Sequence, residues 1–304
     1  MRIVIDLQGA QAANRNRGIG RYTMAFAQAV VRNRGEHEII LALSGLFPDT
    51  IESIRADFDG LLPQENIRVW HAPNAVAFAD SANQWRRHSA ELIREAFLAG
   101  LRPDLVHIGS LFEGLSDDAV TSVGLLSRTV PTAITLFDLI PYIHRSPYLE
   151  NPTVSAWYSE KIEFLRRANL WLAISESSRQ EGLKYLELPE EWVVNASTDA
   201  DAYFQRLKIS GEVESSVRSR YGLSRPFVMY TGGIDHRKNI EGLIRAFSKL
   251  PRDMCKAYQL AIVCSVQPES RHMLEQLVVK QGLSKDAVVL TGFVPEEDLR
   301  ALYM

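Results

Sequence analysis

A short apolar run lies between two amphipathic segments in the stretch from Asn151 to Leu186, NPTVSAWYSEKIEFLRRANLWLAISESSRQEGLKYL. Its centre, Leu170–Ile174, reads as a buried strand, and Asn151–Ala168 and Ser175–Leu186 read as helices on either side of it. The connections between these segments are very short, which is typical of right-handed crossovers between parallel strands. The stretch therefore predicts an α/β fold built on a parallel sheet.

The same alternation extends from this stretch toward both ends of the chain. Toward the N-terminus, further helices are expected at Arg21–Arg34 and Ser81–Ala99. The remaining runs of strand length in this part of the chain are Ile3–Asp6, Ile39–Leu43, Val69-Trp70, Leu105–Ile108, Thr132–Leu136 and Trp192–Val194. A polar segment around Asp199–Glu214 then interrupts the pattern, and we expect it to form part of a hinge.

Beyond the polar segment the pattern restarts on a smaller scale. Strands are expected at Phe227–Thr231, Leu260–Val263 and Val288–Thr291, with helices at 239–249, 269–281 and from Pro295 onward. We therefore predict two Rossmann-like parallel-sheet domains, residues 1–205 and residues 206–304. So few parallel strands leave a thin sheet whose edge is normally covered or extended. The second domain is expected to be incomplete, and the chain to be a C-terminally truncated piece of a longer protein.

Composition excludes several classes of protein. The 304 residues carry a formal net charge of -3 without a large basic patch, so nucleic acid is not an expected partner. The two cysteines, Cys255 and Cys264, have no zinc-like spacing, which favours a reducing compartment and no bound metal. No apolar run approaches the roughly 18 to 20 residues that a membrane span needs. We expect a cytoplasmic protein.

The first candidate motif is Arg17-Gly18-Ile19-Gly20-Arg21-Tyr22-Thr23, which follows the first strand and opens a helix. Gly18 and Gly20 would let a ligand approach the backbone, and the helix N-terminus with Arg21 would favour an anion. A dinucleotide fingerprint is disfavoured because Thr23 stands at the third glycine position and no acidic residue ends the second strand. The alternative is a glycine turn that only reverses the chain.

The second motif is Thr135-Leu136-Phe137-Asp138-Leu139-Ile140-Pro141, in which a carboxylate follows a buried strand. Ligands of open α/β sheets bind at such carboxyl ends. Asp138 could orient a sugar hydroxyl or accept its proton, which makes it the candidate catalytic residue. A turn cap is the alternative, because Asp bonds backbone N–H groups close to it in the sequence.

The third motif is Tyr230-Thr231-Gly232-Gly233-Ile234-Asp235-His236-Arg237-Lys238-Asn239-Ile240. Gly232 clears space beside a strand end, and Arg237 and Lys238 place two cations where a helix begins. Arg grips phosphate oxygens in bidentate fashion, and Lys adds a point charge. This loop is a candidate diphosphate site, although an Arg-Lys pair on a surface loop is often only solvated charge.

Together these three motifs resemble the retaining family 4 glycosyltransferases, which belong to glycosyltransferase group 1 and have two facing Rossmann-like domains, the GT-B fold. The resemblance extends to Ala173–Arg179, similar to the family's strand-then-SES helix start. It also includes Leu290–Leu299, similar to the family's segment beside the donor base.

The resemblance implies transfer of a hexose from a nucleoside-diphosphate sugar, with retention of anomeric configuration and without a required metal or cofactor. GDP-mannose is the donor that we favour. The first domain would hold a glycan or lipid-linked acceptor and the second would hold the donor, in polysaccharide or lipopolysaccharide biosynthesis. A lipid-linked acceptor would bring the protein to the inner face of the membrane, as a peripheral contact.

Three departures from the family pattern matter. Phe137 stands where many relatives have histidine, and Gly233 stands where many have arginine. The family's glutamate pair, spaced eight apart, should follow the Leu299–Tyr303 helix and so lie beyond Met304. We therefore expect this chain alone to transfer sugar poorly or not at all.

Some signals are weaker. Asp199-Ala200-Asp201 spells the DxD of a manganese-binding fold, but its polar context favours a solvated or capping role. Trp85-Arg86-Arg87-His88 could touch a membrane, yet an ordinary core-facing helix is the better interpretation. His107 could line a cleft or be a core histidine. Two other functions stay open: a sugar-nucleotide epimerase on the same fold, and a non-catalytic glycan- or nucleotide-binding module.

Overall fold

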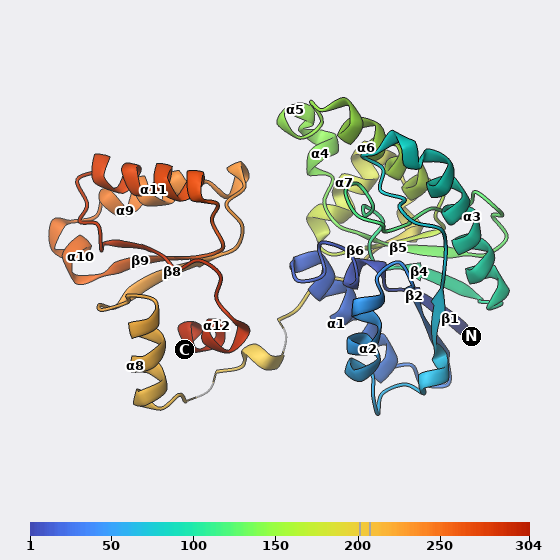
Figure 1. The fold of residues 1–304 in the computed structure, drawn as a ribbon, viewed down its shortest axis with the longest axis horizontal. Coiled ribbons are helices and arrows are strands. Elements are labelled where there is room, and N and C mark those ends of the chain that lie inside the picture. The colour runs from blue at the N-terminus through green and yellow to red at the C-terminus, as the bar shows by residue number, and fades with distance from the viewer. Residues whose placement is uncertain (201, 207) are drawn as a thin grey trace. The chain divides into compact units, whose positions relative to one another are not determined.

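The computed structural model describes residues 1–200, 202–206 and 208–304, which form two compact units, Met1–Asp199 and Ala200–Met304 (Figure 1). The sequence placed the boundary at 205/206, within the polar segment. Each unit is a parallel sheet with helices on both faces, so the predicted α/β class is confirmed. No helix in the described ranges is long and apolar enough to cross a membrane.

Unit 1 contains a seven-stranded sheet in the order β3-β2-β1-β4-β5-β6-β7, with every pair parallel. The chain leaves β1 toward β2 and β3, and then returns to the other side of β1 to form β4. The carboxyl ends of β1 and β4 therefore meet at the point where the strand order reverses. The strands are β1 (Arg2–Asp6), β2 (Glu38–Ser44), β3 (Ile67–Trp70), β4 (Leu105–Ile108), β5 (Thr132–Leu136), β6 (Leu170–Ala173) and β7 (Val193–Asn195).

Two apolar clusters hold the helices of unit 1 to the two faces of this sheet. On one face, α1 (Gly18–Arg32) and α2 (Pro48–Asp57) pack against alternate residues of β1 and β2. On the other, α3 (Gln84–Gly100), α6 (Pro152–Arg166) and α7 (Glu176–Leu186) pack against the intervening residues. The short helices α4 (Ile140–Ile143) and α5 (Arg145–Tyr148) follow β5.

Unit 2 contains a three-stranded parallel sheet in the order β10-β9-β8. Its strands are β8 (Phe227–Thr231), β9 (Gln259–Val263) and β10 (Val288–Leu290). One face is covered by α9 (Ile240–Ser248) and α11 (Pro268–Lys280), and the other by α8 (Gly211–Arg220) and α12 (Glu296–Tyr303), as Figure 1 shows. The short helix α10 (Arg252–Ala257) leads into β9. The described residues thus match the three strands that the sequence predicts for this part of the chain.

Some helices differ from the prediction. The first begins at Gly18 instead of Arg21, so both motif glycines lie in its first turn; their low helix propensity hid this start. The helix α8 occupies the end of the predicted hinge and begins after Ser210, whose hydroxyl accepts from the Val213 N–H at 3.3 Å. Because α8 buries only Val217, it carries little apolar periodicity.

Candidate active site

The carboxyl edge of the unit 1 sheet brings together the first two predicted motifs. The glycine motif follows β1 through the 3-10 turn η1 (Gln8–Ala10), and Asp138 follows β5. The ring of Tyr22 on α1 lies edge-on to Phe137, with centroids 5.5 Å apart. The two motifs are therefore neighbours, as binding at the strand ends requires.

Close packing explains one motif glycine and leaves the other unconstrained. A Cβ at Gly20 would lie 2.3 Å from the Cα and O of Arg15, so the preceding loop can lie against α1 only at a glycine. A Cβ at Gly18 would meet nothing within 4 Å. Arg21 is exposed on the same turn. Gly18 and Arg21 thus border open space, where a ligand could approach the helix N-terminus.

Thr23, at the third position of the glycine motif, packs against glycines of two other segments. Thr23 is buried, and its hydroxyl donates to the Ile19 carbonyl at 2.9 Å. A Cβ at Gly109 would lie 2.6 Å from Thr23 Cγ2, and one at Gly9 would lie 2.8 Å from Thr23 Oγ1. Glycines at the ends of β1 and β4 therefore make the room that a glycine on the helix provides in dinucleotide-binding folds.

Asp138 is exposed at the end of β5, and its Oδ1 accepts from the Ile140 N–H at 3.2 Å. The capping contact that the sequence offered as an alternative is thus present, while the carboxylate still faces solvent. Asp138 also acts on a buried neighbour: burial chiefly, and the negative charge of Asp138 next, raise the pKa of Tyr158. Phenol and carboxylate groups therefore lie together at this strand end.

Sequence reasoning missed Glu113, in the long connection from β4 to β5. The side chain is 2% exposed, and its carboxylate accepts from Ser110 Oγ at 2.8 Å and from Asn14 Nδ2 at 3.2 Å. Burial raises the pKa of Glu113 to about 7, against the opposing effect of these hydrogen bonds. A polar residue soon after a strand end was the only signal that the sequence offered for Glu113.

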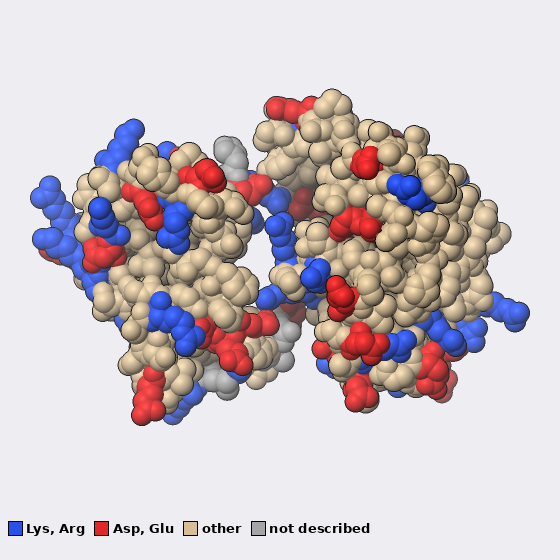
Figure 2. Space-filling view, in the orientation of Figure 1, with Lys and Arg blue, Asp and Glu red and all other residues tan. Residues whose placement is uncertain are grey.

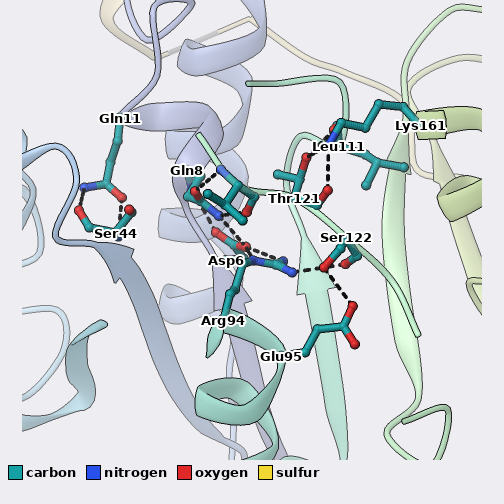
Figure 3. Close-up of polar contacts among 11 residues, drawn as sticks. Asp6, Gln8, Gln11, Ser44, Arg94, Glu95, Leu111, Thr121, Ser122 and Lys161 are labelled. Carbon is teal, nitrogen blue, oxygen red and sulfur yellow. Dashed lines mark hydrogen bonds and ion pairs between the residues drawn. The ribbon is translucent and has the colours of Figure 1, made fainter. Parts of the chain in front are cut away.

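Buried charged side chains hold the β4–β5 connection in place (Figure 3). Arg94 of α3 is fully buried and contacts Asp6 Oδ2 through Nε at 2.7 Å and Nη2 at 2.5 Å. Its Nη1 donates to the Ser122 carbonyl at 3.0 Å. Asp6 also accepts from the backbone and side-chain N–H groups of Gln8 at 3.0 and 3.1 Å. The strand end, the turn after it and the β4–β5 connection thus form one hydrogen-bonded unit.

A second buried cation grips the same connection from α6. The Lys161 ammonium donates to the carbonyl of Thr121 at 2.6 Å and to its hydroxyl at 2.8 Å (Figure 3). Burial lowers the pKa of Lys161 to about 8. On the other side, Glu95 accepts from Ser122 Oγ at 2.7 Å. The connection has no helix of its own and depends on these side chains for its shape.

His107 is a core residue of β4. It is 3% exposed, its Nε2 lies 3.0 Å from Thr135 Oγ1, and its ring contacts Phe26 with centroids 4.7 Å apart. Burial lowers the pKa of His107 to about 4. Of the two options that the sequence left open, the structure shows the core histidine.

This burial predicts a dependence of stability on pH. The folded protein keeps His107 neutral down to about pH 4, whereas the unfolded chain takes up a proton near 6.5. The contribution of neutral His107 to the free energy of unfolding is therefore lost as pH falls from 6.5 toward 4. Relative to His107→Gln, the wild type should lose about 2 kcal/mol between pH 7 and pH 5. Urea titrations at both pH values measure the difference in free energy of unfolding between the two proteins. Glu113 contributes with the opposite pH dependence, but it is present in both proteins, so its contribution cancels. A constant difference would contradict this assignment.

In unit 2 the third motif forms one exposed loop at the carboxyl end of β8. Gly232 has φ of +141°, where a side chain is strained, and a Cβ there would lie 2.9 Å from the Tyr230 hydroxyl. Arg237 and Lys238 lie in a 3-10 turn ahead of α9, and Arg237 Nε is 3.4 Å from Asp235 Oδ1. The loop presents cations beside a helix N-terminus, as a diphosphate site requires.

The other sequence motifs are the helix start at Ser175, the segment Leu290–Leu299 and the DxD at Asp199–Asp201. Ser175 caps α7 by accepting from the Ser178 N–H at 3.1 Å. In the segment Leu290–Leu299, Phe293 is 78% exposed beside Gly292. Asp201 of the DxD lies outside the described residues. Elsewhere in the described chain, no group of three or more His, Cys, Asp and Glu side chains is placed to hold a metal ion.

The basic stretch at the start of α3 is used mainly for packing. Arg86 donates to the Ala75 carbonyl at 2.8 Å, and the Arg87 guanidinium lies 4.1 Å from the centre of the Phe78 ring. Trp85 alone of the stretch is a large exposed apolar side chain, at 64%. Over the face that Figure 2 shows, charges of both signs are interspersed on each unit.

Comparison with known proteins gives a consistent result. Residues 215–304 match the family of glycosyl transferases group 1. The whole chain is 33% identical, over 304 residues, to the serotype-specific mannosyltransferase WbdA of Escherichia coli, of which it spans 36%. It is also 30% identical over 182 residues, 59% of the chain, to 46% of the O-antigen chain mannosyltransferase B of Escherichia coli.

A solved structure shows the same fold. Anabaena HepE, determined in complex with UDP and glucose, matches 99% of this chain and 71% of its own length, with a TM-score of 0.62 at 16% identity. At this identity the likeness concerns the fold alone. The chain thus spans about a third of the length of the WbdA relative and most of the length of HepE. The chain therefore has the two sheet-based units of the GT-B fold, and the second of them carries the match to the group 1 glycosyl transferases.

Proposed function

We propose that this chain is the acceptor-side unit and part of the donor unit of a glycosyltransferase that moves a hexose, most plausibly mannose, from a nucleoside-diphosphate sugar to a glycan or lipid-linked acceptor. The observation that carries the proposal is the 33% identity to a mannosyltransferase along all 304 residues. The relatives are named for O-antigen and serotype-specific mannosyl transfer, which favours polysaccharide or lipopolysaccharide biosynthesis.

In the proposed reaction, unit 1 binds the acceptor and unit 2 binds the donor. Asp138 orients an acceptor hydroxyl or accepts its proton at the end of β5. Gly232 admits the diphosphate to the backbone of the donor loop. Arg237 and Lys238 stabilise the negative charge that develops on the leaving nucleoside diphosphate. Gly18, Gly20 and Arg21 shape the anion-favouring helix start on the acceptor side.

We further propose GDP-mannose as donor, retention of anomeric configuration, no required metal or cofactor, and a cytoplasmic location at the inner face of the membrane. The test is an assay of this chain, and of the longest natural chain that contains it, with GDP-mannose or UDP-glucose and manno-oligosaccharide acceptors. Proton NMR of the product gives its configuration, EDTA tests for a metal, and cell fractionation gives the location.

The same assay separates the alternatives. Conversion of the nucleotide sugar without acceptor would indicate an epimerase. Tight binding of donor or glycan without turnover in the longer chain would indicate a binding module. Acceptor-dependent mannosyl transfer supports the proposal, and its absence from the longer chain contradicts it.

The donor loop gives a direct binding prediction. Charge-assisted hydrogen bonds to phosphate contribute about 1.5–3 kcal/mol each, so Arg237→Ala/Lys238→Ala should weaken GDP binding by tenfold or more. Asp235→Asn is the matched control: it removes the carboxylate that pairs with Arg237 at 3.4 Å and should strengthen binding. Isothermal titration of the chain with GDP measures both effects. Equal affinity for GDP in the wild type, the double alanine variant and Asp235→Asn would mean that the diphosphate binds elsewhere.

A further inference from the structure

Glu113 joins two parts of unit 1 that are far apart in the sequence. Its Oε1 accepts from Ser110 Oγ in its own segment, and its Oε2 accepts from Asn14 Nδ2. Asn14 belongs to loop 13–17, which leads into the glycine motif. From α6, the Trp157 indole donates to the Glu113 carbonyl at 3.3 Å. The carboxylate thus lies under the loop, enclosed by three segments and 2% exposed as a residue.

Loop 13–17 lies on the ligand side of this contact. It carries Arg15 and Arg17, both exposed, directly before the start of α1. Its further contacts include the Ala13 N–H to Asp117 Oδ2 at 2.7 Å and the close approach of Arg15 to Gly20. The backbone N–H groups of Arg15 and Arg17 donate to the Ala12 and Asn14 carbonyls at 2.9 and 2.8 Å, and the Arg17 carbonyl accepts from the Arg21 N–H at 3.0 Å. The Glu113 carboxylate is thus one of the side-chain contacts that hold the loop against the β4–β5 connection.

We propose that Glu113 is a positioning residue that latches loop 13–17 and its arginines beside the acceptor edge, and that the latch opens as Glu113 loses its proton. The assignment of this edge to the acceptor rests on the proposed function, but the latch does not. In the closed loop the carboxyl is out of water, where the protonated form is favoured. When the loop lifts, water reaches the carboxylate, so ionisation favours the open loop.

The surrounding charges support this direction. Among the described residues, the charged groups that act on Glu113 are Asp117, in its own segment, and Lys161 of α6. Burial raises the pKa of Glu113 most strongly and Asp117 raises it further, while the hydrogen bonds from Ser110 and Asn14 and the charge of Lys161 lower it. The contacts from loop 13–17 and from Trp157 are uncharged. The outcome is a pKa of about 7 in the closed loop, so opening becomes more favourable as pH rises toward 7 and levels off above it.

The size of the response follows from linkage between proton binding and opening. With a pKa of about 7 in the closed loop and about 4.5 in the open one, the opening equilibrium should rise about tenfold between pH 6 and pH 8. Hydrogen exchange of the Arg15 and Arg17 amides, corrected for the intrinsic effect of pH, measures this equilibrium without donor or acceptor.

Two variants make the measurement specific. Glu113→Gln keeps the shape of the side chain but cannot titrate, so its corrected protection should not change with pH. Ser110→Ala removes a donor that favours the ionised form and so raises the pKa of Glu113 in the closed loop; the loss of protection should then continue to higher pH and end at lower protection. Unchanged protection in the wild type, or the same slope in Glu113→Gln, would overturn the latch.

The link to the reaction is tested separately. In the assay of the longer chain, the acceptor KM of the wild type should rise between pH 6 and pH 8 more than that of Glu113→Gln, while the donor KM changes equally in both. If the exchange result holds and the acceptor KM does not follow, the latch stands and loop 13–17 is not part of the acceptor site. Failure of the exchange result removes the latch whatever the assay gives.

Discussion

Replacing Arg94 by methionine is expected to lower the free energy of unfolding of unit 1 by about 3–5 kcal/mol, because it leaves the Asp6 carboxylate buried without its cation. Asp6 is 2% exposed, and its remaining donors are the two N–H groups of Gln8. The variant also removes the hydrogen bond to the Ser122 carbonyl, so the β4–β5 connection loses a support at the same time.

All five tryptophans lie in unit 1, so urea unfolding followed by tryptophan fluorescence reports this unit alone. Adding Asp6→Asn to Arg94→Met should recover part of the loss, since the buried charge is then gone. Arg166→Met is the matched control: its pair with Glu163 spans 2.9 Å at the surface and contributes about 1 kcal/mol or less. Similar losses in Arg94→Met and Arg166→Met would mean that the buried pair is energetically unimportant.

Replacing Asp138 by asparagine is expected to reduce kcat/KM for sugar transfer by about a hundredfold or more, since positioned acid–base groups contribute 10²–10⁴-fold. Asparagine can still accept from the Ile140 N–H, so the turn after β5 is kept while the charge is removed. The assay is that of the longer chain with GDP-mannose and a manno-oligosaccharide acceptor.

Asp138→Ala removes the capping contact as well and separates the two roles. If Asp138 is only a cap, the alanine variant should be destabilised by about 1 kcal/mol and the asparagine variant should remain fully active. If Asp138 takes part in the reaction, both variants should be inactive, and Asp138→Asn should unfold at the same urea concentration as the wild type. An asparagine variant that keeps more than a tenth of the activity would exclude the catalytic role.

Local sequence patterns were sufficient to predict the sheet. The limits of β4, β5 and β8 agree with the apolar runs, and β4 and β5 are continuous apolar segments because they are buried on both faces. The positions of the glycine motif, Asp138 and the donor loop were likewise predictable, because chain order alone places the segments that follow parallel strands at one edge of each sheet. Exposed helices such as α8 were missed because they bury too few residues to show the apolar periodicity of an amphipathic helix.

The polar framework of the site could not be predicted from local pattern. Arg94 and Asp6 are 88 residues apart, and Glu113 and Asn14 are 99 apart. In the sequence Arg94 looks like one more charged residue of an amphipathic helix, and Glu113 like a loop acid. Only the fold shows that both are buried, and burial gives each of them its chemistry. The packing of Thr23 was likewise not predictable, because the glycines that accommodate it lie in other segments.

The Asp6 network has a consequence for protein synthesis. Gln8 exchanges hydrogen bonds with the backbone of Val120, 112 residues later, and Asp6 meets its cation 88 residues later. As the nascent chain leaves the ribosome, β1 and β2 can form early, but Asp6 lacks its cation until Arg94 of α3 has emerged, and Gln8 lacks its backbone partner until the β4–β5 connection follows. We therefore expect cotranslational folding of unit 1 to remain incomplete through its first half and to finish in one late step.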